Sequence, residues 1–80
     1  MVSLLRLETT LAASGYKRSA LYAAIGSGLW PRGVKFGGAR AVAWPSNEVA
    51  AINAARLAGR TDAEIRTLVR QLEAARKVAA

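Results

Sequence analysis

Apolar residues in the first third of the chain recur at helical spacing on either side of a short connection. Residues 8–14 favour a short helix, and Gly15 suits its end because glycine adopts the left-handed conformation at little cost. A second helix is expected over residues 18–27, where three apolar residues fall on one face: Leu21, Ala24 and Ile25. Two short helices joined by a tight, glycine-containing turn are typical of a helix-turn-helix.

The middle of the chain changes to alternating apolar and polar positions, which predicts strands. Residues 34–36 and 42–44 each alternate in this way. Residues 37–40 between them form a turn whose glycines accept a positive φ, so a two-stranded hairpin is expected. The opening residues 4–7 suit either a short strand or an extended lead-in.

Two further helices are expected after the hairpin. The third covers residues 46–58, and a capping box of Thr61 and Glu64 predicts that the last helix occupies residues 62–77. Apolar residues along the last helix recur three and four apart. This stripe either packs on the third helix of the same chain or forms a contact between subunits. The candidates for oligomerisation are Ile65, Leu68 and Leu72. The arginines of this helix, Arg66, Arg70 and Arg76, are expected on a solvated face, with contacts to a DNA backbone as the alternative.

These elements predict a mostly α protein with a small β-hairpin. Residues 1–59 are expected to form a winged helix-turn-helix DNA-binding domain, in which the hairpin is the wing. Residues 60–80 are expected to form a C-terminal amphipathic helix, used for packing or oligomerisation. The few large aromatic side chains are assigned to the core: Trp30, Phe36 and Trp44.

Charge narrows the class of partner. The chain has 12 Lys and Arg against 5 Asp and Glu, a net charge of +7 over only 80 residues. Such a field suits a polyanion: DNA, RNA or an anionic membrane surface. No apolar run approaches the roughly 20 residues that a membrane span needs, so no membrane partner is expected.

The residue types that the chain lacks exclude most kinds of metal site and catalytic site. The chain has no Cys and no His, which removes thiolate metal sites, the commonest metal ligand and the commonest general base. Paired carboxylates and nucleophile–base pairs are absent as well. We therefore expect no enzyme activity, no catalytic residue, no metal and no cofactor.

The outward face of the second helix is the first candidate DNA contact. It carries small residues around one tyrosine, and such a face can enter a major groove closely. Two cations stand at its N-terminal end, where phosphate contacts are natural. The alternative is an ordinary amphipathic helix with a solvated face. The candidate residues are Lys17, Arg18, Ser19, Tyr22 and Ala23.

The hairpin is the second candidate contact. Three basic residues and no acidic one lie between Pro31 and Trp44, around a glycine-rich turn suited to follow phosphates or reach a minor groove. The alternative is a solvent-exposed hairpin with ordinary charges. The candidate residues are Arg32, Lys35, Gly38 and Arg40.

The order and spacing of several short motifs resemble the AlpA family of small phage and prophage regulators, which is related to excisionases and to MerR-type winged helices. The motifs are residues 5–7 (LRL), 15–22 (GYKRSALY), 28–31 (GLWP), 34–38 (VKFGG), 42–44 (VAW) and 46–49 (SNEV). The sequence departs from the family at Lys17, where a capping residue is usual, and at Ala23, where an arginine or another polar residue is common. The segment after Gly59 lies beyond the family core.

The resemblance implies a DNA-binding regulator of prophage genes, or a recombination directionality factor (excisionase) that bends DNA and helps an integrase to excise an element. It implies double-stranded DNA and an integrase or recombinase as partners, self-association on DNA, and a place in the bacterial cytoplasm. The alternative from another class is a phage assembly or packaging module, similar to a small terminase subunit, that oligomerises through the last helix. Size measurements with and without DNA discriminate between the two.

Overall fold

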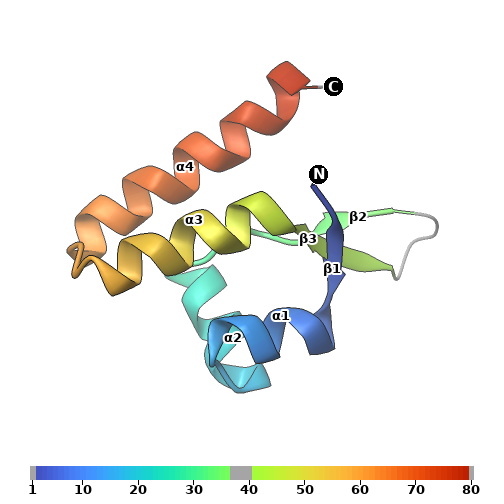
Figure 1. The fold of residues 1–80 in the computed structure, drawn as a ribbon, viewed down its shortest axis with the longest axis horizontal. Helices are drawn as coiled ribbons and strands as arrows, with labels where there is room; N and C mark the ends of the chain where they lie inside the picture. The colour runs from blue at the N-terminus through green and yellow to red at the C-terminus, as the bar shows by residue number, and fades with distance from the viewer. Residues whose placement is uncertain (1, 37–40, 80) are drawn as a thin grey trace.

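The computed structural model describes residues 2–36 and 41–79 (Figure 1). In this part of the chain there are four helices and one small three-stranded antiparallel sheet. The architecture is compatible with a winged helix-turn-helix followed by a C-terminal helix, so the predicted fold class is confirmed. The elements in chain order are β1 (Leu4–Arg6), α1 (Leu7–Ser14), α2 (Arg18–Gly26), β2 (Val34–Lys35), β3 (Val42–Pro45), α3 (Ser46–Leu57) and α4 (Asp62–Ala79).

The sheet has the strand order β1-β3-β2, so β3 is its central strand. On one side Leu5 of β1 lies opposite Trp44, and on the other Val34 of β2 lies opposite Ala43. The opening residues, for which a strand and an extended lead-in were both open, are therefore a strand. They add a third strand to the predicted hairpin because their backbone pairs with β3. The turn of the hairpin, with the candidates Gly38 and Arg40, lies outside the described residues.

The turn between α1 and α2 is built as the sequence predicts. Gly15 has a φ of 78°, and its N–H donates to the carbonyl of Leu11 at 3.0 Å. A side chain at this φ is strained, so glycine is the residue that closes α1 here. The hydroxyl of Ser14 accepts a hydrogen bond from the N–H of Tyr16 at 3.1 Å, which fixes the start of the connection.

Two tryptophans form the centre of the core, and both are 1% exposed. The indole N–H of Trp44 donates to the carbonyl of Pro31 at 2.8 Å, which ties β3 to the segment before β2. Gly33 lies against this contact: a Cβ there would come within 2.1 Å of Val42 Cγ1. Phe36, expected in the core with the tryptophans, is only half-buried. It is not among the side chains that pack against the core, so this expectation was wrong. The residue follows the edge strand β2, and its ring meets the guanidinium of Arg6.

The last helix packs along α3 (Figure 1). Ile65 and Val69 are buried in the same core as the tryptophans, and Leu68 and Leu72 pack against it. The intrachain alternative for the apolar stripe is therefore the arrangement that the structure has. All three oligomerisation candidates of the sequence lie against the chain's own core.

Candidate nucleic-acid interface

The two faces of α2 divide as the sequence predicts. Leu21 and Ala24 are buried in the core, at 0% and 7% exposure. Ser19, Tyr22 and Ala23 are exposed on the other side, and Tyr22 has 52% of its surface open to solvent. The helix therefore presents a narrow surface of small residues around one aromatic side chain. That this surface contacts DNA stays a prediction.

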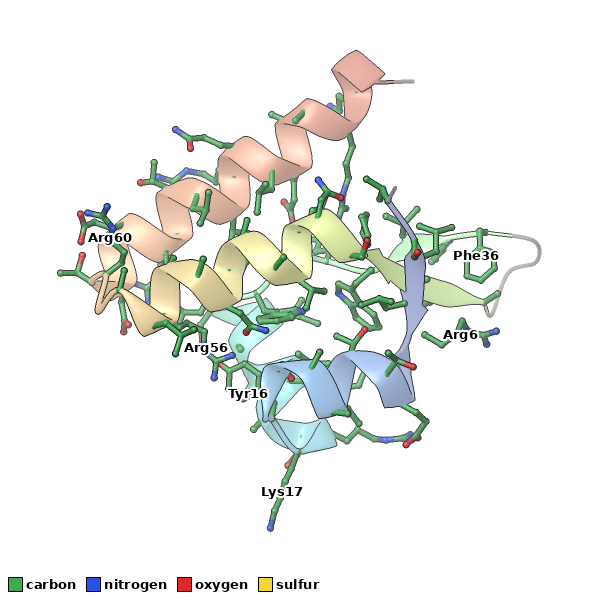
Figure 2. The ribbon with its side chains drawn as sticks, in the orientation of Figure 1. Arg6, Tyr16, Lys17, Phe36, Arg56 and Arg60 are labelled. Atoms are coloured by element: carbon green, nitrogen blue, oxygen red, sulfur yellow. The ribbon has the colours of Figure 1, made fainter. Side chains whose placement is uncertain are left out.

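Two cations stand at the N-terminal end of α2. Lys17 is exposed, and Figure 2 shows its side chain pointing away from the body of the protein. Arg18 lies 3.5 Å from a carboxylate oxygen of Glu8 on α1, with side chains 65% and 84% exposed. So exposed an ion pair contributes about 0–1 kcal/mol, and the guanidinium is therefore free to exchange this partner for another anion.

The basic residues of the wing occupy two different settings. Lys35 is exposed on β2. Arg32 precedes the strand, and its backbone is fixed by α4: its N–H donates to Glu73 Oε2 at 2.9 Å, and its carbonyl accepts from Arg76 Nη2 at 2.8 Å. Its side chain remains exposed. The base of the wing is thus held in place while its cationic group stays open to solvent.

A further cation, Arg6 of β1, contacts Phe36 beside the wing and was not among the predicted contacts. Its guanidinium carbon lies 5.5 Å from the centre of the Phe36 ring, a distance typical of a cation–π contact (Figure 2). Arg6 and Tyr22 line one cavity of about 260 Å³ together with Val42 of β3. The exposed face of α2 and the sheet are therefore adjacent. The sequence signal for this contact was that Arg6 is a single charged residue among the leucines of residues 4–7.

An ion pair fixes α4 to the start of α3, although a solvated face was expected for its arginines. Glu48 is 3% exposed, and its Oε2 accepts from Arg76 Nε at 2.8 Å. The hydrogen bond to Glu48 raises the pKa of Arg76 above its ordinary value. For Arg76 the expectation was wrong, because a buried carboxylate from another helix requires a cation.

A second arginine of α4 holds the end of α2. Arg66 Nε donates to the carbonyl of Ser27 at 2.8 Å, just beyond α2. A Cβ on Gly28 would lie 3.5 Å from Arg66 Cγ, so this side chain lies across the glycine. Together with Arg76 and Glu73 it makes α4 a brace between the end of α2 and the base of the wing.

The helix-turn-helix connection is held by an arginine from α3 (Figure 2). The guanidinium carbon of Arg56 lies 4.7 Å from the centre of the Tyr16 ring, and its Nη1 donates to the carbonyl of Ser14 at 2.8 Å. Tyr16 in turn meets Trp30 edge to face, with ring centres 5.8 Å apart. These contacts join the turn to the core, and spacing along the chain gave no signal for them.

Within the described residues, no group of three or more His, Cys, Asp or Glu is placed to hold a metal ion. In the same part of the chain, no helix is long and apolar enough to cross a membrane. The features that the site offers are cationic side chains, exposed small residues and one exposed tyrosine.

The fold is compatible with that of a winged helix-turn-helix protein. Residues 3–57 match the family described as prophage CP4-57 regulatory protein (AlpA). Because the match covers well over half of the 80 residues, the chain belongs to this family of phage regulatory proteins. The matched segment ends with α3, and α4 follows it. No curated protein and no solved structure matched the chain significantly.

Proposed function

We propose that this protein binds double-stranded DNA non-enzymatically, with the exposed face of α2 in the major groove and the wing along the adjacent backbone. The observation that carries the proposal is that this face of α2 is exposed and has cations at one end. Ser19, Tyr22 and Ala23 are open to solvent, with Lys17 and Arg18 at one end. Small side chains let a helix approach base edges closely, and cations at its start meet phosphates.

The proposed binding is guided mainly by phosphates and DNA shape. The face of α2 offers few groups for bidentate hydrogen bonds to bases, because Ala23 stands at its centre. The net charge of +7 favours contacts to the backbone, whose strength falls with salt. Specificity then depends on DNA deformability and on several copies bound side by side.

We propose that the biological role of this DNA binding is to control a phage or another mobile element. Membership of a phage regulatory family supports a regulator of prophage genes, a recombination directionality factor that works with an integrase, or both. Residues 1–59 carry DNA binding in this proposal, and residues 60–80 brace the wing against α2. The protein would act on DNA in the bacterial cytoplasm.

The alternative role, a phage assembly module that forms a ring through its last helix, needs a free apolar stripe on α4. Ile65 is 7% exposed and Val69 is 4% exposed, both within the chain's own core. Using this stripe between subunits would require α4 to leave the core. No observation favours that alternative, and DNA binding remains the proposal.

Selection from a random pool of duplexes, followed by a footprint on the recovered sequence, tests the proposal. We expect recovered duplexes to show protection in one major groove and the neighbouring minor groove. Recovery of no duplex above background, together with a stable DNA-independent ring in size measurements, would contradict it.

A further inference from the structure

A cationic cavity of about 340 Å³ lies between the end of the recognition helix and α4. Its walls include Gly26 and Ser27 at the end of α2, and Arg32 at the base of the wing. Two arginines of α4, Arg66 and Arg70, complete its basic side. It is distinct from the cavity that Arg6 and Tyr22 line between α2 and the sheet.

The cavity carries an excess of positive charge and of hydrogen-bond donors. Its one acidic lining residue is Glu73, whose Oε2 already accepts the N–H of Arg32. Arg66 Nε donates to the carbonyl of Ser27, and Arg70 Nη2 donates to the hydroxyl of Thr67. Since a guanidinium has five N–H donors, most of the donors on these side chains are available to a ligand.

The inner wall of the cavity includes Trp30. Its indole N–H is buried and has no acceptor among the residues that the structure describes. An indole is a donor only, and a buried donor is normally paired. The cavity therefore lies against a buried, unpaired donor, and its own guanidinium groups outnumber its acceptors. A ligand with several acceptor oxygens matches that excess of donors.

The position of the cavity indicates which anion it meets. Gly26 follows Tyr22 by four residues, so it continues the exposed face of α2 on the same side of the helix. Arg32 marks the beginning of the wing. In B-DNA the major groove and the adjacent minor groove are separated by a sugar–phosphate strand. A protein with a helix in one groove and a wing beside the other has that strand between them.

We infer that the cavity of Arg32, Arg66 and Arg70 binds one phosphodiester group of the DNA strand that passes between α2 and the wing. The inference rests on the proposed function for the source of the phosphate, and it adds α4 to the DNA-binding surface. Arginine suits this task because its planar guanidinium makes paired hydrogen bonds to phosphate oxygens.

The first test uses the full chain and inorganic phosphate, without DNA. Titration is followed through the two indole N–H resonances in NMR spectra of labelled protein. Trp30 is expected to shift with saturation, while Trp44, which donates to Pro31, serves as the internal control. The double variant Arg32→Gln/Arg70→Gln is expected to lose the shift, and Arg60→Gln at the α3–α4 turn is expected to keep it.

These substitutions leave the backbone of the site in place, because residue 32 contacts α4 through its own N–H and carbonyl. Arg66 is kept, since its loss would release the end of α2. Absence of a Trp30 shift in the wild type, or an equal shift in the double variant, would overturn the site.

The second test measures affinity for a recovered duplex over a salt series. The slope of log affinity against log salt is expected to become less steep by about 0.9 for each of the two substitutions, and to stay unchanged in Arg60→Gln. A duplex that binds with an unchanged slope in the double variant overturns the inference while the proposed function stands. Phosphate binding without any DNA binding means that the site takes free phosphate, which overturns the DNA source and the proposed function together.

Discussion

Arg76 and Glu48 meet in a partly buried ion pair, Nε to Oε2 at 2.8 Å, although 28 positions separate them in the chain. The same guanidinium also donates to the carbonyl of Arg32 at the base of the wing. One side chain of α4 thus joins the start of α3 to the wing. A helix that follows the family match is therefore part of what orients the proposed DNA-binding elements.

Removal of Arg76 should destabilise the fold strongly. Arg76→Ala leaves the Glu48 carboxylate buried without a partner, which costs about 3 kcal/mol of unfolding free energy, at the low end for buried pairs because Arg76 is partly exposed. Urea unfolding measures the loss, and Arg70→Ala on the same helix is the control, expected to change it by less than about 0.5 kcal/mol. Equal losses of unfolding free energy in the two variants would show that the ion pair stabilises the fold no more than an exposed arginine does.

Gly33 should tolerate no side chain. Its Cβ would lie 2.1 Å from Val42 Cγ1 and 3.2 Å from Trp44 Cζ2, inside the core. We expect Gly33→Ala to lower the unfolding free energy by about 1–3 kcal/mol, because the neighbours must shift. Gly26→Ala is the matched control, since nothing lies within 4 Å of its added Cβ and alanine favours a helix. Thermal unfolding followed by circular dichroism compares them, and a Gly33→Ala protein as stable as Gly26→Ala would refute this packing.

The start of α4 should lose stability in acid. Hydrogen bonds with the backbone N–H and with the side chain of Thr61 lower the pKa of Glu64 below its ordinary value of 4.5. A carboxyl with a lowered folded-state pKa stabilises the fold above the unfolded value, and this contribution is lost as pH falls through the folded value. The difference in unfolding free energy between wild type and Glu64→Gln should therefore be constant near neutrality and shrink below about pH 4.5. A difference that is independent of pH would contradict the capping role.

Local signals in the sequence predicted the parts of the fold that local contacts build. The capping box is one case: Thr61 N–H donates to Glu64 Oε1 at 2.9 Å, and Glu64 N–H donates to Thr61 Oγ1 at 3.2 Å. The glycine turn between α1 and α2 is another, because the required φ belongs to a single residue.

The contacts that the sequence did not predict join residues far apart in the chain. Arg56 on Tyr16 and Arg76 on Glu48 depend on how helices pack, which no spacing along the chain records. The stripe of α4 was ambiguous for a related reason. Spacings of three and four produce an apolar face whether the partner is α3 or another subunit, and only the packed arrangement distinguishes them.

The candidate DNA contacts also divide into those that local sequence signals predicted and those that depend on residues far apart in the chain. Exposure of Ser19, Tyr22 and Ala23 followed from helical periodicity, because the opposite residues had to enter the core. Arg6 was missed because its contact with Phe36 arises from strand pairing across the sheet. Arg32 was chosen for its charge, whereas the structure shows that its backbone also anchors the wing to α4.

The central claim is that the start of α2 and the wing contact DNA phosphates. The most direct measurement is a salt series of affinity for a recovered duplex with wild type, Arg18→Ala, Arg40→Ala and the control Arg60→Ala. Arg18 and Arg40 variants should remain folded, bind more weakly, and show slopes less steep by about 0.9 each, while the control matches wild type. Unchanged affinity and slope in both variants would contradict the proposed surface.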